Sequence, residues 1–178
     1  KMEWEGIWTK TWLFAGIAAD IKEIGDCFVY DIGRESIVIT RDESEKISAF
    51  YNVCQHRGNK IVTLESGSFN KISCPYHGWS YALDGKLEHV PDRELFEGGV
   101  PCDEKSLKPV RVSVWAGLIF INMNEESPSL ETFLGPIIEQ LKPYKFEKMN
   151  LVKHQTVDVL ETNWKTVRDN FLEQYHVD

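Results

Sequence analysis

Two short stretches, Cys54-Gln55-His56 and Cys74-Pro75-Tyr76-His77, determine how the rest of this sequence is interpreted. The 17 residues 57–73 separate them. Thiolate and imidazole groups bind transition metals well near neutral pH, and a Cys-x-His or Cys-x-x-His turn lets both side chains approach one site. The sequence therefore predicts one metal centre held by two loops, with four candidate ligands: Cys54, His56, Cys74 and His77.

Two kinds of metal centre use two cysteines and two histidines. In a Rieske-type 2Fe-2S cluster, one iron takes both cysteines and the other takes both histidines, which raises the reduction potential. In a structural zinc site, all four ligands surround one ion. The first pair is spaced more closely than in typical zinc fingers, and a Gly-Trp strand follows the second pair where a finger would have a helix. The spacing favours the iron–sulfur cluster, with zinc as the alternative.

The residues next to the two pairs carry a family resemblance. Asn52-Val53 precedes the first pair, Gly58 follows it closely, and Gly78-Trp79 follows the second pair directly. With these neighbours, the region resembles the Rieske domain of the ring-hydroxylating oxygenase family. Arg57 and Trp79 flank the ligands, and they either shield the cluster or are ordinary surface and packing residues.

The resemblance also assigns the four ligands to the two irons. It implies that Cys54 and Cys74 hold the inner iron, and that His56 and His77 hold the outer iron, through which electrons leave.

Short β-branched and aromatic runs, separated by turn residues, fill most of the chain between residues 27 and 123. Asp84-Gly85 is a strong signal for a hairpin turn, and residues 91–109 are predicted to form a long surface loop. We therefore expect a mostly β fold, in which antiparallel sheets of the Rieske (ISP-like) type contain an inserted cluster-binding subdomain. The expected strands are 27–32, 36–41, 47–53, 71–74, 79–83 and 110–122.

Helical patterns are predicted near both ends of the chain. Residues 4–19 carry tryptophans at helical spacing, and Ser127-Pro128 is typical of a helix start. That second pattern runs to Pro143 and is interrupted near Gly135-Pro136, and residues 151–160 then alternate like a strand before a last helix over 162–177. We expect three parts: an N-terminal helical segment (1–25), the Rieske domain (26–125) and the truncated start of an α+β catalytic domain (126–178).

The last predicted helix carries a second group of candidate ligands. Asp169, Glu173 and His176 are spaced i, i+4 and i+7 and therefore share one face, which is most often a solvated face. However, Asn-Trp-Lys at 163–165 and Asp-Asn-Phe-Leu-Glu-Gln-Tyr-His at 169–176 resemble the opening of the catalytic domain of the same oxygenase family. The resemblance implies that His176 is the first ligand of a mononuclear non-haem Fe(II). It also implies that Glu173, an aspartate in many relatives, relays electrons to that iron from the Rieske centre of a neighbouring subunit.

Composition excludes several other classes of protein. The 178 residues carry a formal net charge of −8, which disfavours binding to a nucleic-acid backbone. Apolar stretches are shorter than a membrane span, so we expect no membrane partner and a cytoplasmic location. Cys27 and Cys102 are predicted to be reduced, packed thiols, and His89 and His154 to have surface or packing roles.

The resemblance implies the front part of the large (alpha) subunit of a Rieske oxygenase. Such a subunit takes electrons from a ferredoxin or a flavin-dependent reductase and activates O2 at mononuclear iron, so as to hydroxylate or demethylate a small organic substrate. The full-length family members are commonly homotrimers. A stand-alone Rieske ferredoxin is the alternative, and it would explain residues 54–77 but not residues 163–176. A zinc-stabilised binding module is a third hypothesis.

Overall fold

Strand β3 (Glu35–Arg41) is the centre of the fold in the computed structural model, which describes residues 2–149 and 161–172. Ile37 and Ile39 are buried on one face of this strand, and Val38 and Thr40 are buried on the other. When a strand has apolar neighbours on both faces, its sequence is a continuous run of β-branched residues, and apolar and polar residues do not alternate in it. This explains why residues 37–40 contain no exposed position.

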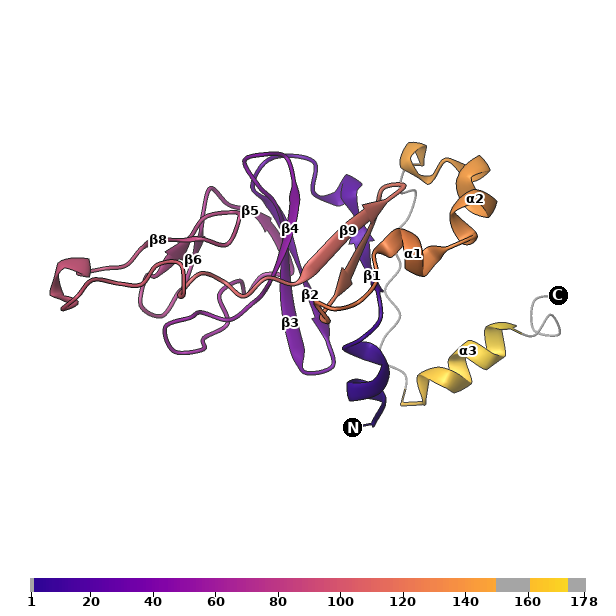
Figure 1. The fold of residues 1–178 in the computed structure, drawn as a ribbon, viewed down its shortest axis with the longest axis horizontal. Coiled ribbons are helices and arrows are strands. Elements are labelled where there is room, and N and C mark those ends of the chain that lie inside the picture. The colour runs from indigo at the N-terminus through magenta and orange to yellow at the C-terminus, as the bar shows by residue number, and fades with distance from the viewer. Residues whose placement is uncertain (1, 150–160, 173–178) are drawn as a thin grey trace.

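The strands form three antiparallel sheets, which follow one another along the long axis of the molecule (Figure 1). The strand orders are β1-β10-β9, β4-β3-β2-β5 and β6-β7-β8. This arrangement confirms the expected mostly β, antiparallel fold. The strands are β1 (Leu13–Ile17), β2 (Asp26–Ile32), β3, β4 (Ile47–Tyr51), β5 (Ser66–Ser68), β6 (Ile72–Ser73), β7 (Ser80–Tyr81), β8 (Leu87–His89), β9 (Arg111–Trp115) and β10 (Leu118–Asn122).

Two apolar cores join the three sheets, and β3 contributes to both. Ile37 and Ile39 pack with Ile119 and Ile121 of β10 between the first and second sheets. Val38 belongs to the second core, which contains residues of the third sheet and both cysteines of the predicted metal centre. Each fully buried isoleucine contributes about 2 kcal/mol through removal of its side chain from water. The cysteines of the metal-binding loops therefore share a core with a strand that is buried on both faces.

The predicted hairpin at Asp84-Gly85 is confirmed and is tied to the second sheet. Gly85 adopts a φ of +85° between β7 and β8, and a Cβ atom at this position would lie 2.4 Å from the ring of the buried Phe50. The Thr40 hydroxyl donates a 2.9 Å hydrogen bond to the Leu83 carbonyl. These contacts hold the β7–β8 turn against β3 and β4.

Two sequence predictions for the sheets were wrong, and one strand was not predicted. Residues 4–19 do not form one helix: the short helices η1 (Trp4–Trp8) and η2 (Ala18–Asp20) flank β1, which pairs with β10 because Leu13 completes the first core. The single run predicted at 110–122 is a hairpin of β9 and β10, with its turn at Ala116-Gly117, where both residues have positive φ. Strand β5 was not predicted, since its residues are Ser-Gly-Ser and it is held mainly by pairing with β2.

Short helices follow the last strand. The break predicted near Gly135 is confirmed, with a φ of +52° at that residue. The N-cap is Ser129, whose hydroxyl accepts a hydrogen bond from the Thr132 backbone, so the helix begins two residues later than Ser127-Pro128 indicated. The helices are η1, η2 (Ala18–Asp20), η3 (Arg93–Leu95), α1 (Leu130–Leu134), α2 (Ile137–Leu141), η4 (Lys142–Tyr144), η5 (Phe146–Lys148) and α3 (Trp164–Leu172).

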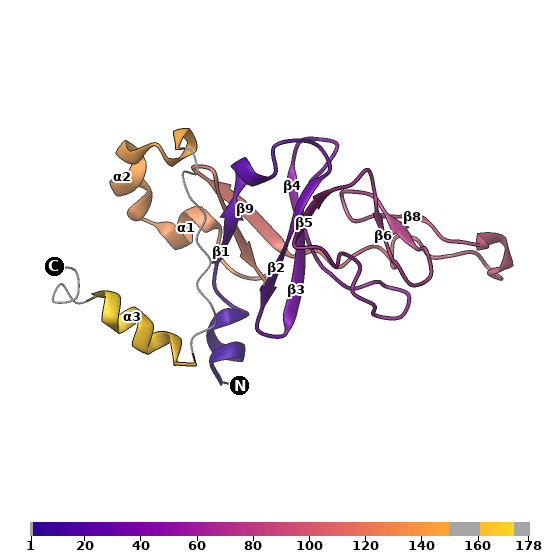
Figure 2. The same ribbon diagram turned by 180° about the vertical axis from the view of Figure 1, so that it is seen from behind.

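Helix α3 lies beside the N-terminal helix η1, as Figures 1 and 2 both show. The Trp164 indole donates to a Glu3 carboxylate oxygen at 3.0 Å and packs edge-on against Trp8, and Lys165 forms an ion pair with Glu3. Phe171 is 73% exposed, so the predicted apolar side of this helix is only partly covered by the described residues. The strand predicted at 151–160 and the helix beyond residue 172 lie outside the described residues. None of the helices described here is long and apolar enough to cross a membrane.

We predict that Gly85→Ala lowers the free energy of unfolding by about 2–4 kcal/mol, because the new Cβ meets the Phe50 ring and a positive φ strains an L-residue. Gly98→Ala is the control, since Gly98 has a φ of +80° but open space around it. It should cost only about 1 kcal/mol. Urea unfolding followed by circular dichroism measures both variants, and equal losses would show that the Phe50 contact contributes nothing.

Candidate metal centre

Two loops with the same backbone hydrogen bonds carry the four predicted ligands. In the first loop the Gly58 amide donates to the Cys54 carbonyl at 2.9 Å, and in the second the Gly78 amide donates to the Cys74 carbonyl at 3.1 Å. A second bond closes each loop, from the Cys54 amide to the Asn59 carbonyl and from the Cys74 amide to the Trp79 carbonyl. The two loops therefore have one geometry, although the histidine stands two residues after the cysteine in one and three in the other.

The glycine four residues after each cysteine makes this closure possible. Gly58 has a φ of +74° and Gly78 a φ of +72°, a region that L-residues with a Cβ enter only at a cost. Both glycines were noted in the sequence as neighbours of the ligand pairs, and the structure gives their physical role. Each one turns the chain so that the ligands of its loop face the other loop.

The two thiols form a buried pair. Cys54 is 2% exposed and Cys74 is 3% exposed, both inside the second core. Burial raises the pKa of the Cys54 thiol, and the neighbouring Cys74 raises it further. Two adjacent thiolates in an apolar core need a positive partner, which ferric iron supplies when it is bound.

The two imidazoles form a second pair, which lies at the surface. The ring centroids of His56 and His77 are 4.7 Å apart. The indole of Trp79, which is 5% exposed, stacks on His56 at 4.9 Å with the ring planes 6° apart, and Tyr76 lies against His77 at 3.8 Å. Trp79 is thus a buried packing residue whose ring lies directly against the ring of a predicted ligand.

Tyr81 was missed as a functional residue by the sequence analysis. Its side chain is fully buried, and its hydroxyl lies 3.4 Å from the Cys54 sulfur while accepting a 3.0 Å hydrogen bond from the Gln55 amide. Since a thiolate carries no proton, the hydroxyl donates its own proton to a metal-bound sulfur. Burial raises the pKa of Tyr81, which keeps this hydroxyl protonated. A tyrosine at an inward strand position needs such a polar partner, and that requirement could have identified it.

Asn52 holds the first loop in place. Its side-chain oxygen accepts hydrogen bonds from the Ile61 and Val62 amides at 3.0 and 2.9 Å, and its amide group donates to the Val62 carbonyl at 2.8 Å. The residue is 1% exposed. These bonds satisfy backbone groups that would otherwise be buried without a partner, so they fix the position of the chain on both sides of Cys54 and His56.

The donor set fits a two-iron cluster. Two sulfur donors lie inside the core, and two nitrogen donors lie at the surface beside them, which is the division of ligands between the irons of a Rieske centre. The donor pairs therefore match the chemistry of 2Fe-2S better than that of one tetrahedral zinc.

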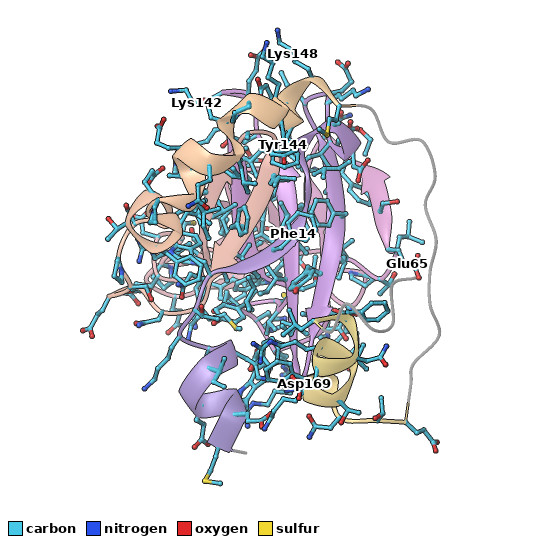
Figure 3. The ribbon with its side chains drawn as sticks, turned by 90° about the vertical axis from the view of Figure 1, so that its right-hand side faces the viewer. Phe14, Glu65, Lys142, Tyr144, Lys148 and Asp169 are labelled. Atoms are coloured by element: carbon cyan, nitrogen blue, oxygen red, sulfur yellow. The ribbon has the colours of Figure 1, made fainter. Side chains whose placement is uncertain are left out.

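The other candidate residues are placed as follows. Cys27 is a buried thiol, whose pKa burial raises to about 11, and Cys102 is a free, partly exposed thiol 3.3 Å from the Arg93 guanidinium. His89 is exposed, as predicted, and Arg57 is exposed beside the ligands. Asp169 lies at the surface of α3 (Figure 3). The other three, His154, Glu173 and His176, lie outside the described residues, so their predicted roles stay predictions.

We predict that Tyr81→Phe lowers the reduction potential of the loaded centre. The lost hydrogen bond to sulfur is worth about 1–1.5 kcal/mol, and 1.4 kcal/mol corresponds to 59 mV for one electron, so the expected shift is about 40–60 mV. Tyr76→Phe is the control, because Tyr76 is 63% exposed and its ring is retained. A redox titration followed by EPR measures the shift. Equal potentials for Tyr81→Phe and the wild type would rule out this role.

Comparison with known proteins agrees with this geometry. The Rieske [2Fe-2S] domain family matches residues 11–102, just over half of the chain. The glycine betaine monooxygenase oxygenase subunit of Pseudomonas aeruginosa is 34% identical over 181 residues, covering 99% of this chain and 40% of that relative.

Solved structures show the same likeness in three dimensions. A quaternary ammonium Rieske monooxygenase, described for carnitine oxidation by gut microbiota and inter-subunit electron transfer, has a TM-score of 0.90 at 32% identity, covering 98% of this chain and 48% of that chain. Naphthalene 1,2-dioxygenase with indole in its active site has a TM-score of 0.89 at 32% identity, covering 98% and 40%. The chain thus spans less than half of each of these relatives. It belongs to the Rieske [2Fe-2S] domain family and is homologous, along nearly all of its length, to part of Rieske oxygenase alpha subunits.

Proposed function

We propose that Cys54, His56, Cys74 and His77 hold a Rieske-type 2Fe-2S cluster, and that this chain is the electron-transfer part of a Rieske non-haem iron oxygenase. One observation carries the proposal: two loops of equal geometry place a buried thiol pair beside a surface imidazole pair. When bound, the cluster supplies one-electron chemistry. Burial of the cysteines keeps water away from the sulfurs, and the exposed His56 with the partly exposed His77 lets a partner protein come close to the redox centre.

The same proposal covers the rest of the oxygenase. His176 binds the mononuclear iron, and Glu173 links that iron to the Rieske centre of a neighbouring subunit in a homotrimer. A ferredoxin or flavin-dependent reductase in the cytoplasm supplies the electrons, and O2 is used to hydroxylate or demethylate a small organic substrate. Support comes from relatives described as monooxygenases and dioxygenases, one of them in connection with inter-subunit electron transfer. The proposed division of the chain is 1–25, 26–125 and 126–178.

The stand-alone Rieske ferredoxin is less well supported. The likeness to oxygenase subunits extends over 98–99% of the chain, well past the Rieske domain at residues 11–102. Within that additional stretch, α3 packs on the N-terminal helix η1 through Trp8, Glu3 and Trp164. A ferredoxin would need neither the added stretch nor this contact.

We predict that the purified chain is red-brown and contains about two irons and two acid-labile sulfides, with a Rieske-type EPR signal after dithionite reduction. Cys74→Ser should lose the cluster, because a hydroxyl is a poor ligand for this iron. Cys27→Ser is the matched control, since Cys27 is a buried thiol of the same core without a histidine partner. A colourless wild-type chain that binds one zinc would overturn the proposal.

We also predict that His176→Ala, made in the polypeptide at its natural length, removes mononuclear iron but leaves two cluster irons and two sulfides. His89→Ala is the control, because His89 is an exposed histidine at the end of β8. Iron analysis and EPR of the ferrous site after nitric oxide addition distinguish the two iron populations. If His176→Ala retains its full iron content, His176 is not a ligand of the mononuclear iron.

A further inference from the structure

Two basic side chains lie beside the exposed ring of His56. Arg57 and Lys108 line the same open cavity of about 620 Å³ as His56. Both basic residues are exposed. We call Arg57 and Lys108 the basic rim.

The charge of the basic rim is not cancelled locally. None of its members forms a salt bridge with another described residue. Glu35 lines the same cavity, but its carboxylate lies 3.7 Å from the guanidinium of Arg34. In a chain of net charge −8, a positive patch beside the histidines is a local exception.

A second cavity at the histidine pair has a different chemistry. It has a volume of about 440 Å³, and His56 and His77 border it together with Pro91, Leu95, Phe96 and Asp92. The same loop adds two exposed acids, Glu94 and Glu97, with Arg93 as its one basic residue between 91 and 99. An acidic protein is repelled at this cavity and attracted to the basic rim, so the two cavities suit different partners.

From this asymmetry we infer that the electron donor of this chain is an acidic one-electron carrier protein that docks on the basic rim and delivers its electron through His56. The inference rests on the proposed cluster and names the chemistry of its partner. The step is a single electron transfer: the donor loses one electron, the histidine-bound iron gains it, and no atom moves between the proteins. Docking at the basic rim brings the donor to an exposed imidazole, and electron transfer becomes faster as this distance shortens.

The test compares two double variants that change the net charge equally. The rim variant is Arg57→Gln and Lys108→Gln. The control variant is Lys22→Gln and Lys148→Gln, two exposed lysines outside the metal-binding loops. Lys148 ends η5, and the helices that follow β10 lie at the opposite end of the long axis from the third sheet (Figure 1). Visible absorption, EPR and cluster iron should be unchanged in both, since no ligand is altered.

The probe is an acidic plant-type [2Fe-2S] ferredoxin, first in its oxidised form, so that binding is measured without electron transfer. At low salt we expect the dissociation constant to rise about tenfold or more in the rim variant and less than about threefold in the control, with the difference disappearing at high salt. Calorimetry or surface plasmon resonance gives these values. Equal binding by both variants would overturn the inference.

Two electron-transfer rates provide a second readout, because the rim variant should change them in opposite directions. The rate of cluster reduction by the reduced ferredoxin should fall about tenfold in the rim variant at low salt. Oxidation of the reduced cluster by the basic protein cytochrome c should become faster in the same variant, which a damaged fold would not cause. If both rates fall together, the inference is wrong. If the wild-type chain has no Rieske spectrum, it is the proposed function that fails.

Discussion

Two backbone hydrogen bonds close each metal-binding loop, and the rest of the site depends on this closure. The bonds need a glycine at positive φ four residues after the cysteine, as at Gly58 and Gly78. Once both loops are closed, the thiols point into the apolar core and the imidazoles remain at the surface. The separation of sulfur and nitrogen donors, on which the chemistry of a Rieske centre depends, therefore originates in backbone geometry rather than in the ligands themselves.

The loops keep this geometry because the strands that they pack against are held in place by burial and hydrogen bonds. β3 is buried on both faces, and its Thr40 hydroxyl anchors the β7–β8 turn through the Leu83 carbonyl. Tyr81 extends from β7 to the Cys54 sulfur and the Gln55 amide of the other loop. A single buried side chain thus couples the position of the second loop to the electron density on a ligand of the first. Packing and redox tuning share the same contact.

The sequence predicted the mostly β, antiparallel fold class correctly. It also singled out the two loops with their glycines, because these form a local pattern and are closed by local hydrogen bonds. Tyr81 and Asn52 act across 26 and 9–10 residues of chain, and no local periodicity reports such contacts.

The N-terminal strand illustrates the same limit for the fold. Tryptophans at helical spacing indicated a helix over 4–19, yet Trp12 is buried with its indole donating to the Pro128 carbonyl, and Leu13 pairs with Ile121. Contacts with residues more than 100 positions away determine the conformation of this segment, although the local pattern favours a helix.

The charge that a docking partner meets also depends on a few nearby residues and not on the net charge of the chain. A net charge of −8 suggests no particular redox partner, because surface charges more than about 10 Å apart are largely screened from each other at 0.1 M salt. The field that a docking protein meets within that distance is set by few residues: Arg57 and Lys108 beside His56 in one cavity, and Asp92 with its apolar neighbours in the other. Since His56 lines both cavities, one redox centre can face two partners of different chemistry, and composition alone cannot reveal that arrangement.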